Sequence, residues 1–426
     1  MKTVICAGGK GTRISTIFSD IPKPMIKIGD KPILEHEIIC LRDQGFKDII
    51  ITISHMGEKI REYFKDGRWL GVNIDYYFEE TPLGNAGALL KIKDKLDDDF
   101  LLLNADSMFD IDFNRFVKFH KEKGGLASIF VHPNYHPYDS GLIFVDKNDS
   151  VTSWINKEDV RPKWYRNLVN AGIHILSPKL LDQHFEGEKV DLDRMILKPL
   201  CGSNKLFAYQ SSEYVRDMGT PDRFYAVSKD FENGLVHKRN LANKQKAIFL
   251  DRDGTINKYV GFLRNIDDFE LLPNVAKAIR MINDSEYLAI IISNQPVIAR
   301  GEVSFEELDE IHNKMETLLG NEGAYIDAIY YCPHHPDKGF EGERPELKFD
   351  CDCRKPKIGL LLKAQKRFNI DLEHSYFVGD SSIDIQTGKN ANMKTILVKK
   401  GPIDDKYQVE PDYQISDLSE IEKIIF

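Results

Sequence analysis

Two short apolar segments, each followed at once by residues suited to phosphate chemistry, constrain the fold of this chain most strongly. Residues 3–13 read TVICAGGKGTR, and residues 247–255 read AIFLDRDGT. Open α/β sheets bind ligands at the carboxyl ends of their strands, so each segment predicts a parallel strand that delivers a reactive loop. One loop is rich in glycine and the other carries two aspartates. The sequence therefore predicts two different active sites, not a repeat.

The predicted fold class is α/β, with two doubly wound domains. A length of 426 residues allows two or three domains, each with its own core. Apolar strands alternate with helical stretches in both halves, which predicts parallel sheets covered on both faces. A polar, basic stretch separates a helical pattern from the strand at 247. The predicted division is a first domain at 1–231, a linker at 232–245 and a second domain at 246–426.

The amino-acid composition narrows the classes of binding partner and the cellular location. The formal net charge of −9 argues against nucleic acid, because phosphate backbones favour basic surfaces. There is no apolar run long enough to span a bilayer and no secretory signal pattern, so we expect no membrane partner and a cytoplasmic location. Six cysteines in a chain of this length do not indicate a disulfide scaffold.

The first loop is suited to a polyphosphate. Gly8, Gly9 and Gly11 let backbone N–H groups approach an anion closely. Arg13 adds a bidentate charge, and Lys23 in IPKPM adds a mobile one. Asp106 follows the apolar run FLLLNAD, as expected for a residue at a strand end.

Together with PLGNAGALL at 82–90 and VRDMGTPDRF near 217, these motifs resemble the nucleotidyltransferases that join a sugar 1-phosphate to a nucleoside triphosphate. The resemblance covers roughly residues 1–230 and implies a Rossmann-like domain whose Asp106 and Asp217 hold Mg²⁺. It makes Arg13 and Lys23 catalytic, assigns Gly84 and Asn85 to the nucleotide loop, and assigns Gly141, Lys157 and Asn170 to the sugar pocket. The alternative is that Asp106 and Asp217 only cap a helix and a turn.

The second loop is suited to phosphoryl transfer. Asp251 and Asp253 are two residues apart, so an extended backbone points both carboxylates to one side. One can attack as nucleophile, and the other can act as acid and then as base. Ser293 ends the apolar run LAIIIS, Lys355 lies in CRKP, and Asp380 ends YFVGD.

This order of motifs resembles the haloacid dehalogenase-like (HAD-like) phosphatases. The resemblance implies that Ser293 and Lys355 bind the transferring phosphoryl group. It also implies a Mg²⁺ site made by Asp251, the backbone carbonyl of Asp253 and Asp380, with Asp384 in support.

Four soft or borderline ligands occur in two close pairs, Cys332 with His334 and Cys351 with Cys353. This spacing predicts a structural, tetrahedral Zn²⁺ site in the second domain. His335 is the nearest competitor of His334, and the alternative is free cysteines beside a surface histidine.

The zinc loop and the stretch NQPVIARG at 294–301 resemble the D-glycero-D-manno-heptose 1,7-bisphosphate phosphatases, whose loop histidinol-phosphate phosphatases share. The resemblance implies that Asn294 and Arg354 contact the substrate. Pro296 and Val297 replace the relatives' Ser-Gly, which we expect near the substrate entrance.

The resemblances together imply a bifunctional enzyme of activated-heptose synthesis, feeding a glycan such as lipopolysaccharide or an S-layer glycan. The phosphatase removes the 7-phosphate, and the transferase consumes the resulting heptose 1-phosphate. GTP is the expected nucleotide, by analogy with a heptose 1-phosphate guanylyltransferase. The alternatives are another sugar or nucleotide, a histidinol-phosphate-type phosphatase, or one non-catalytic half.

Overall fold

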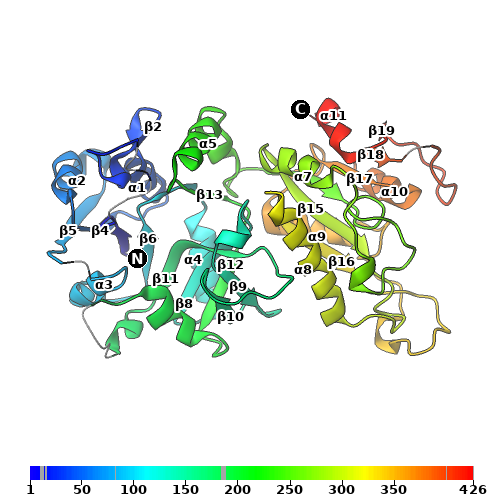
Figure 1. Cartoon of the computed structure of the whole chain (residues 1–426), viewed down its shortest axis with the longest axis horizontal. Helices are drawn as coiled ribbons and strands as arrows, with labels where there is room; N and C mark the ends of the chain where they lie inside the picture. Colours follow the sequence, from blue (N-terminus) through cyan, green and yellow to red (C-terminus); the bar gives the residue numbers. More distant parts are fainter. Residues whose placement is uncertain (10–13, 15–16, 82, 184–188, 400, 426) are drawn as a thin grey trace. The chain divides into compact units, whose positions relative to one another are not determined.

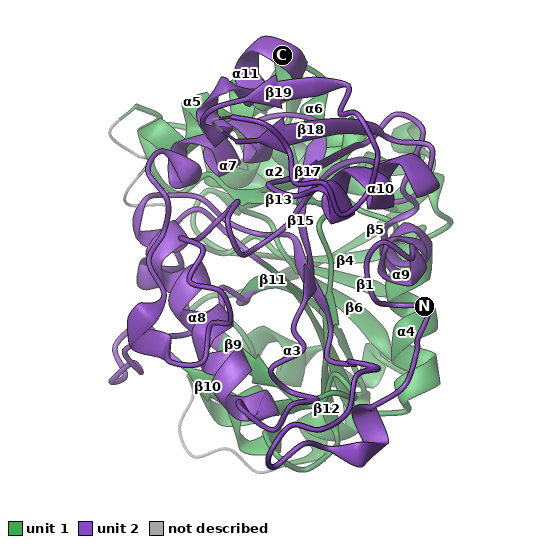
Figure 2. Ribbon diagram, turned by 90° about the vertical axis from the view of Figure 1, so that its right-hand side faces the viewer, with its two compact units in different colours: residues 1–132, 143–155, 170–240 green, residues 133–142, 156–169, 241–426 purple. Residues whose placement is uncertain are grey.

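The computed structural model describes residues 1–9, 14, 17–81, 83–183, 189–399 and 401–425. The chain forms two compact units, coloured separately in Figure 2. Unit 1 contains residues 1–132, 143–155 and 170–240, and unit 2 contains residues 133–142, 156–169 and 241–426. Two segments from within the first half of the sequence therefore group with the second half. The domain bounds 1–231 and 246–426 stay predictions.

Unit 1 is built on a mixed sheet with a parallel centre (Figure 1). Strand β1 (Thr3–Cys6) pairs in parallel with β4 (Asp48–Ile53) on one side and with β6 (Phe100–Asn104) on the other. β4 pairs in parallel with β5 (Asn73–Phe78). The predicted parallel sheet is confirmed for these strands, which hold Gly8, Gly9 and Asp106 at one edge.

The sheet of unit 1 is not parallel throughout. Strand β11 (Val169–Leu176) runs antiparallel to β6, although the sequence analysis expected parallel strands. The apolar pattern of a buried strand is the same in both directions, which explains why the direction was missed. The remaining strands of this sheet are β8 (Ala127–His132), β9 (Leu142–Val145), β10 (Val151–Ile155) and β12 (Leu206–Gln210).

Helices and two small sheets complete unit 1. The helices are α1 (Ile33–Asp43), α2 (Gly57–Phe64), α3 (Gly87–Lys91), α4 (Phe113–Lys123), α5 (Pro221–Glu232) and α6 (Leu235–Lys238). The small sheets pair β2 (Lys27–Ile28) with β3 (Lys31–Pro32), and β7 (Ser107–Asp110) with β13 (Tyr214–Asp217). The core joins Ile5, Ile51 and Leu103 of the sheet to Leu34 and Phe116 of the helices.

Unit 2 contains a parallel sheet in the order β16-β15-β14-β17-β18-β19. These strands are β14 (Lys246–Leu250), β15 (Tyr287–Asn294), β16 (Ala328–Cys332), β17 (Tyr376–Gly379), β18 (Lys394–Val398) and β19 (Tyr413–Ile415). The helices are α7 (Val275–Asn283), α8 (Phe305–Asn321), α9 (Gly359–Phe368), α10 (Ser382–Asn390) and α11 (Glu422–Ile425). The predicted doubly wound architecture is confirmed for this unit.

Alternation along β14 explains why both faces of this sheet are covered. Ile248 and Leu250 pack into one apolar cluster with α7 and α8, whereas Ala247 and Phe249 pack into another with α9. Successive side chains of a strand point to opposite faces, so the apolar run 247–250 of this strand needs two apolar layers. Asp251, the first polar residue after β14, is thereby placed at the carboxyl end of the sheet.

Helix α10 packs closely on the sheet at a glycine. A Cβ added to Gly388 would lie 2.5 Å from Thr395 Cγ2 and 2.9 Å from Phe377 Cβ. Glycine usually weakens a helix by about 1 kcal/mol relative to alanine, so packing explains its use here.

We expect Gly388→Ala to destabilise unit 2 by about 1–3 kcal/mol, because the overpacking outweighs the gain in helix propensity. Urea unfolding monitored by activity of the second site measures the effect. Adding Thr395→Ser removes the clashing methyl group, keeps the hydroxyl, and should recover part of the loss. An unchanged or higher stability of Gly388→Ala would contradict this packing argument.

Candidate active sites

The first site is a cavity of about 430 Å³ at the carboxyl edge of the unit 1 sheet. It is lined by the ends of β1 and β6 and by the loop before α3. Of the residues singled out in the sequence, its lining includes Gly8, Gly9, Lys23, Gly84, Asn85 and Asp106. The structure thus brings together residues from four separate motifs.

A lysine and an aspartate meet in this cavity. Lys23 Nζ donates to Asp106 Oδ2 at 2.9 Å. The fully buried Glu37 of α1 is a neighbour that the sequence analysis missed, and its pKa is raised by burial and by the charge of Asp106. Glu37 lies in a helical stretch without a recognised motif, so the sequence did not indicate a role for it. Lys23 and Asp106 thus place a positive group and carboxylate oxygens on the wall of the cavity.

The second predicted metal ligand of this site, Asp217, reaches the same neighbourhood through strand register. Asp217 of β13 pairs with Ser107 of β7, and Met218 N donates to Asp106 O at 3.2 Å. Burial alone would raise the pKa of Asp217, but Arg223 and the Gly219 N–H outweigh it and lower that pKa. Both oxygens accept from Arg223 Nη1 at 2.9 Å. Asp217 is therefore held ionised, the form that a Mg²⁺ ligand requires.

The loop before α3 requires glycine at one position. Gly84 has φ +80°, and a Cβ there would lie 2.5 Å from Val190 O. Asn85 Oδ1 accepts from Leu192 N at 2.7 Å, which fixes the loop beside the cavity.

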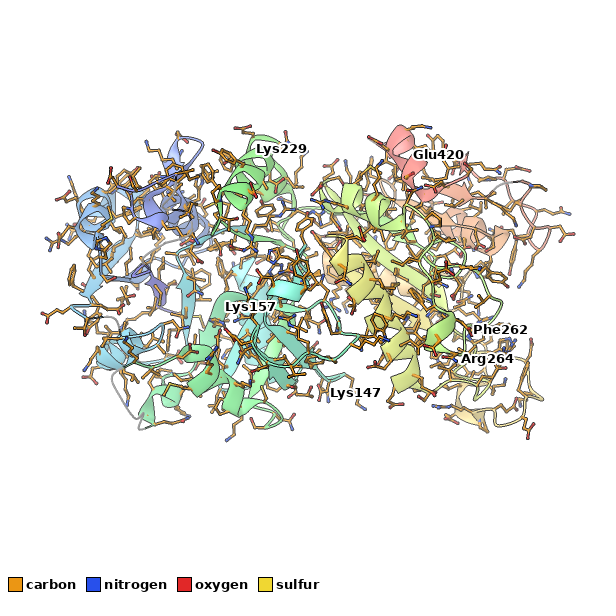
Figure 3. The ribbon with its side chains drawn as sticks, viewed as in Figure 1. Lys147, Lys157, Lys229, Phe262, Arg264 and Glu420 are labelled. Atoms are coloured by element: carbon orange, nitrogen blue, oxygen red, sulfur yellow. The ribbon has the colours of Figure 1, made fainter. Side chains whose placement is uncertain are left out.

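The other residues predicted for this site are not among the described residues that line the cavity. Gly11 and Arg13 lie outside the described residues. Asn170 of β11 accepts from Gly172 N at 3.1 Å and does not line the cavity. Gly141 and Lys157 belong to unit 2, where Lys157, labelled in Figure 3, forms an ion pair with Asp139. Their assignment to a sugar pocket stays a prediction.

The second site surrounds a buried lysine in unit 2. Lys355 Nζ donates to Asp251 Oδ1 and to Asp384 Oδ1, each at 2.6 Å. Burial raises the pKa of Asp251 to about 8; Lys355 opposes this shift, and Asp384 adds to it. Two hydrogen bonds join the Asn294 side chain to the Lys355 backbone. Lys355 N donates to Asn294 Oδ1 at 3.0 Å, and Asn294 Nδ2 donates to Lys355 O at 3.2 Å. They fix the backbone of the lysine in place.

Three carboxylates converge on one point beside this lysine. Asp251, Asp380 and Asp384 each place an oxygen within 4.8 Å of the others. Burial and the charge of Asp384 raise the pKa of Asp380 to about 6. Asp251 and Asp380, whose pKa values are raised, crowd against Asp384, and a divalent cation relieves such crowding, so these residues fit Mg²⁺. Gly254, with φ +91°, allows the close approach, since its Cβ would lie 2.1 Å from Asp380 Oδ2.

Asp253 lies in a different environment from Asp251. Its carboxylate accepts from Arg252 Nη2 at 2.8 and 2.9 Å, from Gln295 Nε2 at 2.8 Å and from Asn257 Nδ2 at 3.0 Å. Burial opposes ionisation, yet Arg252 and these bonds lower the pKa of Asp253. Arg252 itself is fully buried and also contacts His312 Nε2 at 3.2 Å.

The sequence analysis missed these supporting groups, namely Arg252, Gln295, Asn257 and His312. The only available signal was the arginine enclosed between the two aspartates of DRD. Ser293, at the end of β15, was predicted, and its hydroxyl accepts from Gln295 Nε2 at 2.8 Å. Arg354, which directly precedes Lys355, donates to His334 O at 3.2 Å. This bond links the predicted zinc loop to the active-site lysine.

Val297 lies in a buried apolar cluster. It is only 1% exposed and packs with Ile298, Val303 and Leu308; its expected position near the substrate entrance stays a prediction. The change from glycine to valine at this position therefore fills a small apolar cluster.

The predicted zinc ligands form a compact cluster. The three Sγ–Sγ distances among Cys332, Cys351 and Cys353 are 3.2–3.4 Å, and His334 Nδ1 lies 3.2 Å from Cys353 Sγ. A tetrahedron with Zn–S bonds of 2.3 Å has edges of about 3.8 Å, so a small expansion accommodates Zn²⁺. The four residues fit a closed, structural site, as predicted.

Among the described residues, no helix has the length and apolar content needed to cross a membrane.

Comparison with known proteins gives separate matches for the two halves. A nucleotidyl transferase family model matches residues 2–234, and an HAD-hydrolase-like model matches residues 352–421. The D-glycero-beta-D-manno-heptose-1,7-bisphosphate 7-phosphatase of Pasteurella multocida is 40% identical over 184 residues, which is 42% of this chain and 97% of that protein.

Two further matches concern the first half. The UTP–glucose-1-phosphate uridylyltransferase of Synechocystis is 35% identical over 246 residues, covering 54% of this chain and 59% of that protein. The crystal structure of HddC from Yersinia pseudotuberculosis aligns with 54% of this chain and 99% of its own, with 26% identity and a TM-score of 0.48.

We expect Cys351→Ser to remove bound zinc and to lower the thermal unfolding temperature of unit 2, since a structural zinc site stabilises the fold directly. Metal analysis of the purified protein and a thermal melt measure both effects. Cys201→Ser is the matched control because Cys201 lies outside the cluster. Equal zinc content in the two variants would contradict the assignment.

We expect Mg²⁺ to bind the second site more tightly as the pH rises toward about 8. Asp251 ionises in the folded, metal-free protein only near that pH, so at lower pH the cation must displace a proton. The raised pKa also means that the metal-free fold loses stability as the pH rises from about 4 to about 8. Calorimetric titration at pH 6, 7 and 8 should show affinity rising by up to about tenfold per unit. Asp251→Asn should flatten this dependence, and a flat profile for the unmodified protein would contradict it.

Proposed function

Because the chain belongs to the nucleotidyl transferase family through residues 2–234 and to the family of heptose-1,7-bisphosphate 7-phosphatases through its C-terminal half, we propose that it catalyses two consecutive steps of activated-heptose synthesis. The first step removes the 7-phosphate of D-glycero-D-manno-heptose 1,7-bisphosphate. The second joins heptose 1-phosphate to a nucleotide. The supporting observation is that one chain holds two chemically different sites. The product expected from the phosphatase site, a sugar 1-phosphate, is the class of substrate that a sugar nucleotidyltransferase uses.

In the phosphatase step, Asp251 is the nucleophile. Its carboxylate attacks the 7-phosphorus and forms an aspartyl-phosphate, while Lys355 neutralises charge on the phosphoryl oxygens and Ser293 hydrogen-bonds them. Asp251, Asp380 and the backbone carbonyl of Asp253 are the residues that would hold Mg²⁺, with Asp384 in support, and the cation would supply further charge neutralisation there.

Asp253 moves the protons of this step. It must carry a proton to the leaving sugar oxygen and then take one from the water that hydrolyses the aspartyl-phosphate. Its bonds to Arg252 and Gln295 favour the ionised form, which suits the second role. For the first role, Asp253 must be protonated when substrate is bound.

In the transferase step, little protein chemistry is needed, since the sugar phosphate is already an ionised nucleophile. Its oxygen attacks the α-phosphorus of the nucleoside triphosphate, and pyrophosphate leaves in line. Lys23 neutralises charge on the reacting phosphates, and Gly8 and Gly9 leave room for the phosphate chain. Asp106 and Asp217 are the residues that would hold Mg²⁺.

We propose GTP as the nucleotide, which makes the product GDP-heptose. UTP is the second candidate, because the Synechocystis relative of the first half is a uridylyltransferase. Both nucleotides are cytoplasmic metabolites, so we propose that the enzyme works in the cytoplasm.

The test is to incubate the full chain with heptose 1,7-bisphosphate, Mg²⁺ and each nucleoside triphosphate in turn, and to identify products by mass spectrometry. Inorganic phosphate, pyrophosphate and GDP-heptose are expected with GTP. UDP-heptose in place of GDP-heptose would replace the guanylyl assignment. Absence of phosphate release, with release from histidinol phosphate instead, would overturn the phosphatase assignment.

We expect Asp251→Asn to lower phosphate release by about 10³-fold or more, and to leave nucleotidyl transfer to added heptose 1-phosphate unchanged. Asp106→Asn should lower nucleotidyl transfer by about 10²–10³-fold and leave phosphate release unchanged. Asp267→Asn and Asp97→Asn, at exposed positions, are the matched controls. If Asp251→Asn released phosphate at the normal rate, the proposed nucleophile would be wrong.

A further inference from the structure

The buried arginine between the two aspartates of the second site is hydrogen-bonded on two sides. Arg252 Nη2 donates to both oxygens of Asp253, at 2.8 and 2.9 Å, and to Gln295 Oε1 at 3.1 Å. Its Nη1 donates to His312 Nε2 at 3.2 Å. A guanidinium is planar and carries its donors in a rigid fork. The bond on Nη1 therefore fixes the direction in which Nη2 points.

His312 lies on α8 and acts as an acceptor toward Arg252. An arginine can only donate, so His312 Nε2 must be the unprotonated ring nitrogen. Burial lowers the pKa of His312 to about 3, and the charge of Arg252 adds to this shift, whereas that of Asp253 opposes it. The residue is only 5% exposed. A neutral, enclosed ring is suited to holding the guanidinium in one orientation.

A segment from a distant part of the sequence holds α8 in place. Residues 156–169 belong to unit 2, like α8 (Figure 2). Tyr165 N donates to Thr317 Oγ1 at 2.8 Å, and the same hydroxyl oxygen lies 3.0 Å from Tyr165 O. Another backbone N–H of this segment donates to the buried carboxylate of Glu316. Glu316 and Thr317 lie about one helical turn after His312, so the segment fixes the part of α8 that presents the imidazole ring.

The orientation of Arg252 matters because it determines where the Asp253 carboxyl group lies. Gln295 Nε2 donates to Asp253 Oδ2 and to Ser293 Oγ, so one amide group links the carboxylate to the hydroxyl proposed to bind the phosphoryl oxygens. As Asp251 bonds to phosphorus and the bond from phosphorus to the sugar oxygen breaks, the Asp253 proton moves to that oxygen. The transfer requires the carboxyl group within hydrogen-bond reach of the oxygen. A guanidinium that turned would move the carboxyl group out of this position.

We propose that His312 is a positioning residue of the phosphatase reaction and that the segment 156–169 holds it in place. Through its bond to Arg252, His312 keeps Asp253 where it can protonate the leaving sugar oxygen. The inference rests on the proposed phosphatase function. It makes that function depend on residues that precede position 246, although the sequence analysis placed the phosphatase entirely within 246–426.

The first experiment replaces His312 in the full chain. His312→Leu removes the acceptor and leaves a buried Arg252 donor unpaired, so kcat with heptose 1,7-bisphosphate should fall by about 10- to 100-fold, a part of what a general acid contributes. The KM should change little, because no contact with the substrate is lost. His312→Gln keeps an acceptor at a similar reach and should recover most of the rate. His374→Leu, at an exposed histidine of unit 2, is the matched control.

A second substrate separates positioning from folding. 4-Nitrophenyl phosphate has a leaving group that departs as an anion and needs no proton from Asp253. His312→Leu should lower kcat/KM much less with this ester, so the ratio of kcat/KM for heptose 1,7-bisphosphate to that for the ester should fall by about tenfold or more. A thermal melt shows whether each variant is folded. A proportional loss with both substrates would mean that His312 only supports the fold, and the inference would be overturned.

Thr317→Val tests the contribution of the segment 156–169. The substitution keeps the shape of the side chain and removes the hydroxyl group that accepts from Tyr165 N. We expect the same selective loss with heptose 1,7-bisphosphate, smaller than in His312→Leu. If Thr317→Val kept the ratio of the two substrates that the unmodified chain shows, the role of the segment would be overturned.

The inference and the proposed function fail in different ways. If the unmodified chain released no phosphate from heptose 1,7-bisphosphate, the phosphatase assignment would fail before any variant was made. If the unmodified chain released phosphate and His312→Leu did so at the same rate, only the role of His312 would fail.

Discussion

Each site depends on a lysine that is held against an aspartate at the carboxyl end of a buried parallel strand. Lys23 contacts Asp106 at 2.9 Å in unit 1, and Lys355 contacts Asp251 at 2.6 Å in unit 2. Parallel strands bring several strand ends to one edge, which concentrates carboxylates and makes them repel one another. The lysine offsets this repulsion when no cation is bound. Lys355 is only 3% exposed, so its removal would leave buried charges uncompensated.

The second site was predictable because its main residues follow from strand positions. Asp251 follows β14, and its neighbours in the sheet, β15 and β17, deliver Ser293 and Asp380. Any parallel sheet with this strand order brings those three residues together. The zinc cluster was predictable for another reason, since the ligand types and the close pairing of Cys332 with His334 determine the site almost without reference to the fold.

What the sequence could not predict depends on side-chain orientation. The sequence places Asp251 and Asp253 just after β14, but it does not show whether the side chain of Arg252 between them is buried. The structure turns the Asp253 carboxylate onto Arg252, with Gln295 and Asn257 as further donors. Val297 shows the same limit, because the residue type does not reveal that it packs into an apolar cluster away from solvent. Glu37 also escaped notice, since it belongs to no motif with a fixed spacing.

The proposed order of reaction places a strict demand on the phosphatase site. Its substrate carries two phosphates, and the one at position 1 must survive, since the transferase uses it as nucleophile. The position 7 phosphate is attached to a primary carbon outside the sugar ring, whereas the position 1 phosphate is attached to the ring itself. Asp251 and Lys355 are 8% and 3% exposed, so the phosphorus must approach groups that are almost completely buried. A phosphate on a flexible primary carbon can reach them without bringing the ring along. In the proposed reaction order, the burial of Asp251 would therefore also protect the bond on which the second step depends.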